Sequence, residues 1–349
     1  MIVTAAAPIR VCDCGGWTDT WFARYGRVFN IAVRPCAEVQ VEVFPAGGDR
    51  PRVVIDALDF GDRYAPAHKA GHWDRHPLLE ATLDALPMPA AVAIEATITC
   101  EAPAGASTGT SAAVTVALCG ALDRVRGGTL HRREIARLAH AIETDGLKQQ
   151  SGIQDQICSA MGGVNDIEMT GYPDAEVRPL RLSDATRWEL ERRLALVFLG
   201  RGHRSSDVHE RVIAHLSGLG PDCADLAALR KAACDARDAL ADGDFAGLGR
   251  AMRENTEGQR RLHPDLVCAD ADRVIAVARE HGAAGWKVNG AGGDGGSLTL
   301  VGPVSATARR AMLREIRAEV AGASVIPTRL DADGLRVWTS APRPRGSQG

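Results

Sequence analysis

Alternating apolar and polar positions dominate the first hundred residues of the chain, where β-branched residues are also frequent. Alternation with a period of two is typical of strands that bury one face, so the pattern predicts a strand-rich first block. A helix that begins at a proline is expected at residues 77–86. The predicted strands are residues 2–6, 29–33, 38–44 and 91–99.

The apolar spacing becomes helical after residue 102, with hydrophobic positions recurring every three or four residues. Residues 172–186 are polar and contain two prolines, which predicts a linker. The uninterrupted apolar run at 194–199 then predicts a buried strand that opens a second block. We therefore expect an α+β protein with two domains, residues 1–185 and 186–349. Further helices are predicted at 111–126, 131–145, 207–217, 225–241, 245–262, 269–281 and 305–321, and further strands at 286–288, 297–301, 324–329 and 335–339.

Composition narrows the classes of partner. The chain has 349 residues, a formal net charge of −3 and a pI of about 6.4, so no long-range positive field attracts nucleic acid or an anionic membrane surface. No apolar run reaches the ~18 residues that span a bilayer. Nine scattered Cys, and no signal peptide at the first residues, predict reduced thiols in a cytoplasmic protein. A small molecule is the expected ligand, and the oligomeric state stays open between monomer and homodimer.

Three loops rich in small residues carry the candidate chemistry. Residues 103–113 (PAGASTGTSAA) open a helix, so backbone N–H groups and the helix dipole would favour an anion such as phosphate. A tight turn capped by Ser or Thr is the alternative interpretation of this segment alone. Residues 290–296 (GAGGDGG) hold more glycines than a hairpin needs, which indicates close approach of a ligand to the backbone. The first loop, residues 7–20, offers Arg10, Asp13 and Asp19 around a Gly pair.

In this order, the three loops resemble the three motifs of the GHMP small-molecule kinases, which include galactokinase, homoserine kinase and mevalonate kinase. The middle motif of that family reads PxGxGLGSSAA, and this chain matches it at Pro103, Gly105, Gly109 and residues 111–113. The third motif matches at residues 287–296 (KVNGAGGDGG). The resemblance covers essentially the whole chain and implies the two-domain GHMP kinase fold, with an N-terminal block like domain 2 of ribosomal protein S5 and a C-terminal ferredoxin-like α/β sandwich. The departures from the middle motif are Ser107, Thr108 and Thr110.

The resemblance also implies two catalytic residues. The segment SGIQDQ at 151–156 is similar to the family's catalytic-base loop, which implies that Asp155 accepts the proton of the acceptor hydroxyl. Arg10, nine residues before Asp19, keeps the spacing at which galactokinase-like members place an Arg and a sugar-binding Asp. An Arg beside Asp155 would favour the ionised carboxylate and could stabilise charge on the transferring group. An Asp that caps a turn is the alternative interpretation of Asp155.

ATP and Mg²⁺ are the cofactors that the resemblance implies. Glu143 stands where the family places a Mg²⁺-binding Glu, with Ser111 or Thr110 as the hydroxyl ligand. One carboxylate and one hydroxyl suffice, because a hard cation also takes phosphate oxygens and waters. The residues implied to bind ATP are Pro103, Gly105, Ser107, Thr108, Gly109, Thr110, Ser111, Ala112, Gly290, Gly292 and Gly293.

Short segments of the chain resemble two branches of the family. GGWTDT at residues 15–20 resembles the fucokinases, whereas residues 152–156 and 162–168 resemble bacterial D-glycero-D-manno-heptose 7-phosphate kinases. Both branches phosphorylate an anomeric hydroxyl, so we expect a C1 kinase of a sugar or sugar phosphate that feeds nucleotide-sugar synthesis. A kinase of another sugar or of a non-sugar alcohol, and a non-catalytic sugar or nucleotide sensor, are the alternatives. The residues implied to bind the acceptor are Gly16, Trp17, Thr18, Asp19 and Arg204.

Overall fold

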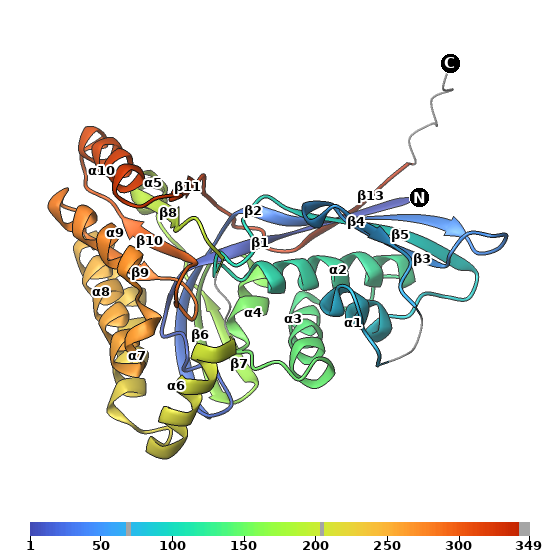
Figure 1. Cartoon of the computed structure of the whole chain (residues 1–349), viewed down its shortest axis with the longest axis horizontal. Coiled ribbons are helices and arrows are strands. Elements are labelled where there is room, and N and C mark those ends of the chain that lie inside the picture. The colour runs from blue at the N-terminus through green and yellow to red at the C-terminus, as the bar shows by residue number, and fades with distance from the viewer. Residues whose placement is uncertain (68–70, 203–205, 342–349) are drawn as a thin grey trace.

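Strands β1 (Ile2–Cys14) and β2 (Gly26–Pro45) form a long antiparallel hairpin that extends through the first block to the second (Figure 1). The computed structural model describes residues 1–67, 71–202 and 206–341. The pairing of β1 with β2 shifts register after Pro8 and again after Val11. Such bulges bend a strand and re-aim its side chains. The last residues of β1 consequently pack among apolar side chains of the second block.

This hairpin is the centre of a large mixed sheet with the order β13-β1-β2-β5-β3-β4, to which β6, β7 and β12 are added through β2. Strand β13 comes from the far end of the described chain and pairs with β1, so that Val337 lies opposite Ala5. Both ends of the described chain therefore build one sheet. The remaining strands are β3 (Val53–Ala57), β4 (Asp62–Tyr64), β5 (Val92–Cys100), β6 (Val164–Gly171), β7 (Asp174–Pro179), β12 (Arg329–Leu330) and β13 (Arg336–Ser340).

Helices α1 to α4 cover one face of the large sheet (Figure 1). The central helix, α2, is rich in Ala, Gly and Thr, and these small residues let it approach its neighbours closely. A Cβ on Gly120, for example, would lie 2.9 Å from the side chain of Leu335. The covering elements are α1 (Pro77–Ala85), α2 (Thr110–Arg126), α3 (Arg132–Ala141), a π-helical turn (Ile142–Gly146) and α4 (Gln154–Met161).

The second block is built on a smaller antiparallel sheet with the order β11-β8-β10-β9. Its core joins these strands to α9 and α10, while α7 and α8 pack against each other and against the hairpin. No helix in the described ranges is long and apolar enough to cross a membrane. The elements are α5 (Asp184–Arg193), β8 (Leu194–Phe198), α6 (Ser206–Leu219), α7 (Ala224–Ala241), α8 (Phe245–Leu262), α9 (Ala269–Glu280), β9 (Gly285–Val288), β10 (Ser297–Val301), α10 (Ala306–Glu319) and β11 (Ser324–Ile326).

The structure confirms the α+β architecture but corrects the predicted linker. Residues 172–186 are not a connector: β7 pairs along β6, and α5 begins at Asp184. Only Val177 of β7 is buried, because β7 lies at the edge of the sheet and most of its residues face solvent. A polar edge strand therefore looks like a linker in the sequence. The division between residues 185 and 186 stays a prediction.

The strands of the first block are also longer and more numerous than predicted. Residues 7–14 continue β1 instead of forming a loop, and the strands predicted at 29–33 and 38–44 are parts of the single strand β2. Strands β3, β4 and β6 were not predicted. Pairing of β2 with β6 along one half and with β5 along the other keeps it continuous, and that pairing is a tertiary property.

Candidate active site

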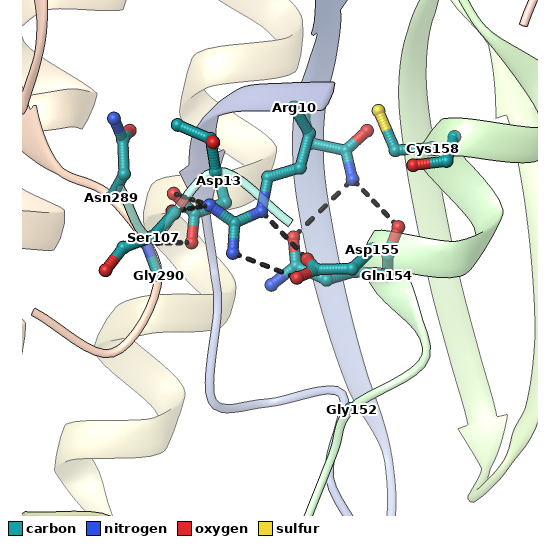
Figure 2. A network of polar contacts seen from close by, with 12 residues as sticks. Arg10, Asp13, Ser107, Gly152, Gln154, Asp155, Cys158, Asn289 and Gly290 are labelled. Atoms are coloured by element: carbon teal, nitrogen blue, oxygen red, sulfur yellow. Dashed lines mark hydrogen bonds and ion pairs between the residues drawn. The ribbon is translucent and has the colours of Figure 1, made fainter. Parts of the chain in front are cut away.

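Arg10 and Asp155 form a bidentate ion pair, although they lie 145 residues apart in the chain (Figure 2). Nε of Arg10 lies 2.8 Å from Oδ1 of Asp155, and Nη2 lies 3.1 Å from Oδ2. The third nitrogen donates to the backbone carbonyl oxygen of Ser107. Burial alone would lower the pKa of Arg10, but the carboxylates of Asp13 and Asp155 outweigh it and raise that pKa. The charged guanidinium therefore fixes the orientation of the Asp155 carboxylate.

Two helix N-termini meet at Asp155. The carboxylate lies in the first turn of α4, and Gly109, the residue before α2, faces it from the other side. Gly109 has a φ of +70°, and a Cβ there would lie 3.1 Å from Oδ2 of Asp155. Glycine at this position therefore permits both the left-handed backbone and the close approach. The partial positive charge of two helix ends favours an anion beside them.

A buried carboxylate, Asp13, links β1 to the second block. Its Oδ1 lies 3.3 Å from Nζ of Lys287 on β9, and its Oδ2 accepts the N–H of Gly290 at 3.0 Å. Nη1 of Arg10 is 3.9 Å from Oδ1 of the same carboxylate. The side chains of Asp13 and Lys287 are both buried. This chain of charges therefore runs from the third loop through Asp13 and Arg10 to Asp155.

The second and third loops are also held together directly. Ser297 Oγ donates to the carbonyl oxygen of Ala106 at 2.5 Å, and Asn289 Nδ2 donates to Ser297 Oγ at 2.9 Å. Ser107 has a φ of +58°, which is unusual for a residue with a side chain. Gly296 stands so close to Ser107 that a Cβ there would lie 2.6 Å from its hydroxyl oxygen. The two loops thus form one continuous wall.

A cavity with a largely polar lining, here called the polar cavity, lies between this wall and residues 149–151. It opens on the N-terminal turn of α2, where Thr108 and Thr110 place their hydroxyl oxygens 3.2 Å apart. Backbone N–H groups, hydroxyls and the nearby Arg10 suit a phosphate chain. The lining includes Ser107, Gly109, Ser111, Ala112, Glu143 and Asp155.

Glu143 reaches the polar cavity from the π-helical turn that ends α3. One carboxylate oxygen, Oε2, accepts the Nε2–H of Gln156 at 2.9 Å, and the other has no hydrogen-bond partner among the described residues. Burial raises the pKa of Glu143 to about 7. An orphaned carboxylate oxygen, in a residue that lines the same cavity as Ser111 and Thr110, makes with their hydroxyls a donor set that suits Mg²⁺. The residues present therefore fit a metal held jointly with phosphate.

A second cavity, here called the aromatic-walled cavity, also borders Asp155. Its wall contains Trp17, Trp21 and the carboxylate of Asp19. Asp19 Oδ2 accepts the N–H of Gln154 at 3.1 Å, and burial raises the pKa of Asp19 to about 6. The lining also includes Gly16, Phe22, Ser151, Gly152, Ile213 and Gly290.

A third, mainly apolar cavity of about 530 Å³ lies beside the loop at residues 103–105. Phe60 and His76 stand on one side, with ring centroids 5.2 Å apart. Gly105, Thr110 and Ser111 border both this apolar cavity and the polar cavity. A flat apolar group attached to a phosphate chain would therefore fit across the two.

Two family models match the chain in the same order as the structural blocks. Residues 77–163 match the N terminal domain of the GHMP kinases, and residues 236–317 match the GHMP kinases C terminal domain. The chain therefore contains both domains of the GHMP kinases.

The individual relatives are named as kinases of different substrates. The D-glycero-alpha-D-manno-heptose 7-phosphate kinase of Campylobacter jejuni is 28% identical over 222 residues, which are 63% of this chain and 63% of that protein. The mevalonate kinase of Thermococcus onnurineus is 28% identical over 249 residues, 70% of this chain and 69% of that protein. A solved structure, described as a D-glycero-D-manno-heptose 1-phosphate kinase from Bacteriodes thetaiotaomicron, has a TM-score of 0.74 at 21% identity, and the match covers 98% of this chain and 100% of that one. That likeness shows a shared fold.

Most residues that the GHMP kinase motifs nominated border one of the three cavities. Pro103 borders only the apolar cavity, whereas Ser107, Thr108 and Ala112 border the polar one. Arg204 lies outside the described residues.

Three nominated residues do not line these cavities. Thr18 is fully buried, and its hydroxyl donates to the carbonyl oxygen of Gly15 at 2.7 Å, so it holds a turn. A Cβ on Gly292 would lie 1.9 Å from the carbonyl oxygen of Leu266, and the N–H of Gly293 donates to that oxygen at 3.1 Å. Close packing against Leu266 constrains both glycines, and their contact with ATP stays a prediction.

The motifs alone missed two residues that the geometry makes central, Asp13 and Lys287. Lys287 was visible as the residue that begins the third motif, and lysine is rare in this arginine-rich chain. Asp13 was visible only as an acid inside an apparent loop. Neither signal indicates that the two side chains meet, because their contact depends on how the blocks dock.

Proposed function

We propose that this protein is an ATP-dependent kinase that phosphorylates the anomeric (C1) hydroxyl of a sugar or sugar phosphate. The observation that carries the proposal is the position of Asp155, which borders both the polar cavity and the aromatic-walled cavity. A phosphate chain in the first cavity and a hydroxyl in the second would meet at this carboxylate.

Asp155 would act as the general base. As the acceptor oxygen attacks the terminal phosphorus, its proton passes to a carboxylate oxygen of Asp155, and the bond from that phosphorus to the bridging oxygen breaks to release ADP. Arg10 holds both oxygens of the carboxylate, so the base is oriented before the substrate arrives. The positive charge of Arg10 would also stabilise negative charge on the transferring group.

The polar cavity would hold the phosphates of ATP. The backbone N–H groups at the start of α2 and the loop at Gly290 would bind phosphate oxygens. Glu143, with the hydroxyls of Ser111 and Thr110, would hold Mg²⁺, which neutralises charge on the β and γ oxygens when bound. The apolar cavity beside Phe60 would take the base of the nucleotide.

The aromatic-walled cavity suits a sugar. The carboxylate of Asp19 can accept hydrogen bonds from neighbouring hydroxyls, while the rings of Trp17 and Trp21 offer apolar faces to the C–H side of a sugar ring. The proposed C1 position rests on the resemblance of residues 15–20, 152–156 and 162–168 to kinases of anomeric hydroxyls. Its product, a sugar 1-phosphate, would feed the synthesis of a nucleotide sugar.

A kinase of a non-sugar alcohol is the second candidate, since the similarity to mevalonate kinase covers 70% of this chain. Incubation with ATP and Mg²⁺ and a panel of acceptors, read by phosphorus NMR, separates the two. The panel contains L-fucose, D-galactose, D-mannose, D-glycero-D-manno-heptose 7-phosphate and mevalonate. We expect a new resonance from a phosphate group bonded to an anomeric carbon. Turnover of mevalonate alone would replace the first candidate by the second, and ATP binding without turnover of any acceptor would favour a sensor.

A further inference from the structure

Tyr172, in the turn between β6 and β7, connects two segments that border the aromatic-walled cavity. Its backbone N–H donates to the carbonyl oxygen of Arg24 at 3.0 Å, and its ring lies edge-on to Trp21, with centroids 6.5 Å apart. Its hydroxyl donates to the carbonyl oxygen of Ser151 at 3.0 Å. The first two contacts reach the segment after β1, and the third reaches the segment before α4. Tyr172 therefore ties together two parts of one cavity wall.

His140, on α3, completes the hydrogen bonding of this hydroxyl. Its Nε2 lies 2.9 Å from Oη of Tyr172 and 3.4 Å from the carbonyl oxygen of Ser151. The Tyr172 hydroxyl has a single proton, so when it donates to the carbonyl oxygen of Ser151, the proton between Oη and His140 comes from Nε2. His140 is buried, and burial lowers its pKa, which favours the neutral ring. Both side chains thus converge on the carbonyl oxygen of Ser151.

The segment held by Tyr172 packs closely against the Asp19 carboxylate. Gly152 follows Ser151, and a Cβ on Gly152 would lie 2.1 Å from Oδ2 of Asp19. The N–H of Gln154 donates to the same oxygen at 3.1 Å. A small shift of residues 151–154 would therefore move the group that meets the acceptor hydroxyls. Tyr172 itself is not among the described residues that line the polar cavity or the apolar cavity.

We infer that Tyr172 is a positioning residue for acceptor binding: its hydroxyl, oriented by His140, holds residues 151–152 against Asp19. The inference rests on the proposed kinase function. It assigns a role to a residue in the segment that the sequence pattern presented as a linker.

The variant Tyr172→Phe tests it, because it removes the hydroxyl and keeps the ring on Trp21. With the acceptor of the panel that turns over fastest, we expect the KM for the acceptor to rise about three- to tenfold, as the loss of one or two hydrogen bonds predicts. The KM for ATP should stay within twofold. The matched control is Tyr25→Phe, whose hydroxyl bonds instead to the exposed Asp222; it should leave both constants unchanged.

Hydrogen–deuterium exchange of the ligand-free protein gives a readout that does not depend on catalysis. Exchange at residues 149–154 should be faster in Tyr172→Phe and in His140→Gln, and unchanged in Tyr25→Phe. If the wild type phosphorylates no acceptor, the proposed function fails, while exchange still tests the positioning role. The inference is overturned if Tyr172→Phe leaves exchange at 149–154 unchanged, if its acceptor KM changes less than twofold, or if both KM values rise together.

Discussion

Asp13 and Lys287, 274 residues apart in the chain, form an ion pair with 3.3 Å between Oδ1 and Nζ, and both side chains are buried. The same Asp13 carboxylate accepts the N–H of Gly290 and lies beside Arg10, which holds Asp155. One buried pair therefore ties the second block to the strand that carries the proposed catalytic arginine. The arrangement of the site therefore depends on how the two blocks dock.

Removing one partner of this ion pair should lower the stability of the protein. In Lys287→Met the Asp13 carboxylate stays buried without its counter-charge, so we expect the free energy of unfolding to fall by about 3–5 kcal/mol in urea denaturation. The double variant Asp13→Asn, Lys287→Met should recover part of this loss, because no unpaired charge remains.

The exposed pair of Lys231 and Asp235 provides the control for that measurement. Lys231→Met should cost no more than about 1 kcal/mol, as is usual for ion pairs in solvent. If Lys287→Met were as mild as Lys231→Met, the buried pair would not couple the blocks.

Replacing the proposed base should affect turnover and not nucleotide binding. For Asp155→Asn we expect kcat to fall by about 10² to 10⁴, since a positioned general base contributes that factor. The KM for ATP should change little, because the phosphates are assigned to the loops. Steady-state kinetics check this, with the exposed Asp174→Asn as control. A rate within threefold of the wild type would remove Asp155 from its proposed role.

The contact between Gly152 and Asp19 predicts an effect on the acceptor. Gly152→Ala forces a Cβ toward Oδ2 of Asp19, so we expect catalytic efficiency with the acceptor to drop about 10- to 100-fold, the scale of a misplacement near 1 Å. The KM for ATP should stay near the wild-type value. Gly218→Ala, where nothing lies within 4 Å of the added atom, is the matched control. Equal behaviour of the two variants would contradict the steric argument.

The buried carboxyl of Glu143 predicts a pH dependence of stability. Its pKa rises from 4.5 to about 7 on folding because burial disfavours the charge. Between these values the folded state holds a proton that the unfolded state has released, so the stability contributed by Glu143 declines as the pH rises. Relative to Glu143→Gln, the ligand-free wild type should lose up to about 1.4 kcal/mol per pH unit in this window.

Denaturation of both proteins from pH 4.5 to 7 measures this difference. Glu257→Gln, a change at an exposed carboxylate, should leave the change in free energy of unfolding with pH as it is in the wild type. A constant difference between wild type and Glu143→Gln across the range would rule out the raised pKa.

Local patterns predicted the elements whose burial follows their own periodicity. Helix α2 begins after a Gly/Ser/Thr loop and ends at Gly127, and both signals lie within the segment. Strand β7 gave no such signal, because only Val177 is buried at the edge of the sheet. Helix α4 has eight residues, too few for a clear helical repeat, so Asp155 was placed in a loop.

The sequence by itself determined the chemistry available: three small-residue loops, their order, and the residue types that resemble the GHMP kinase motifs. The tertiary structure decided which of those residues act together. It joined Arg10 to Asp155, brought Lys287 to Asp13, and packed Gly292 against the backbone of Leu266. The reason is physical. Turn and helix preferences act between neighbours in the chain, whereas burial and ion pairing depend on groups that only folding brings within a few ångströms.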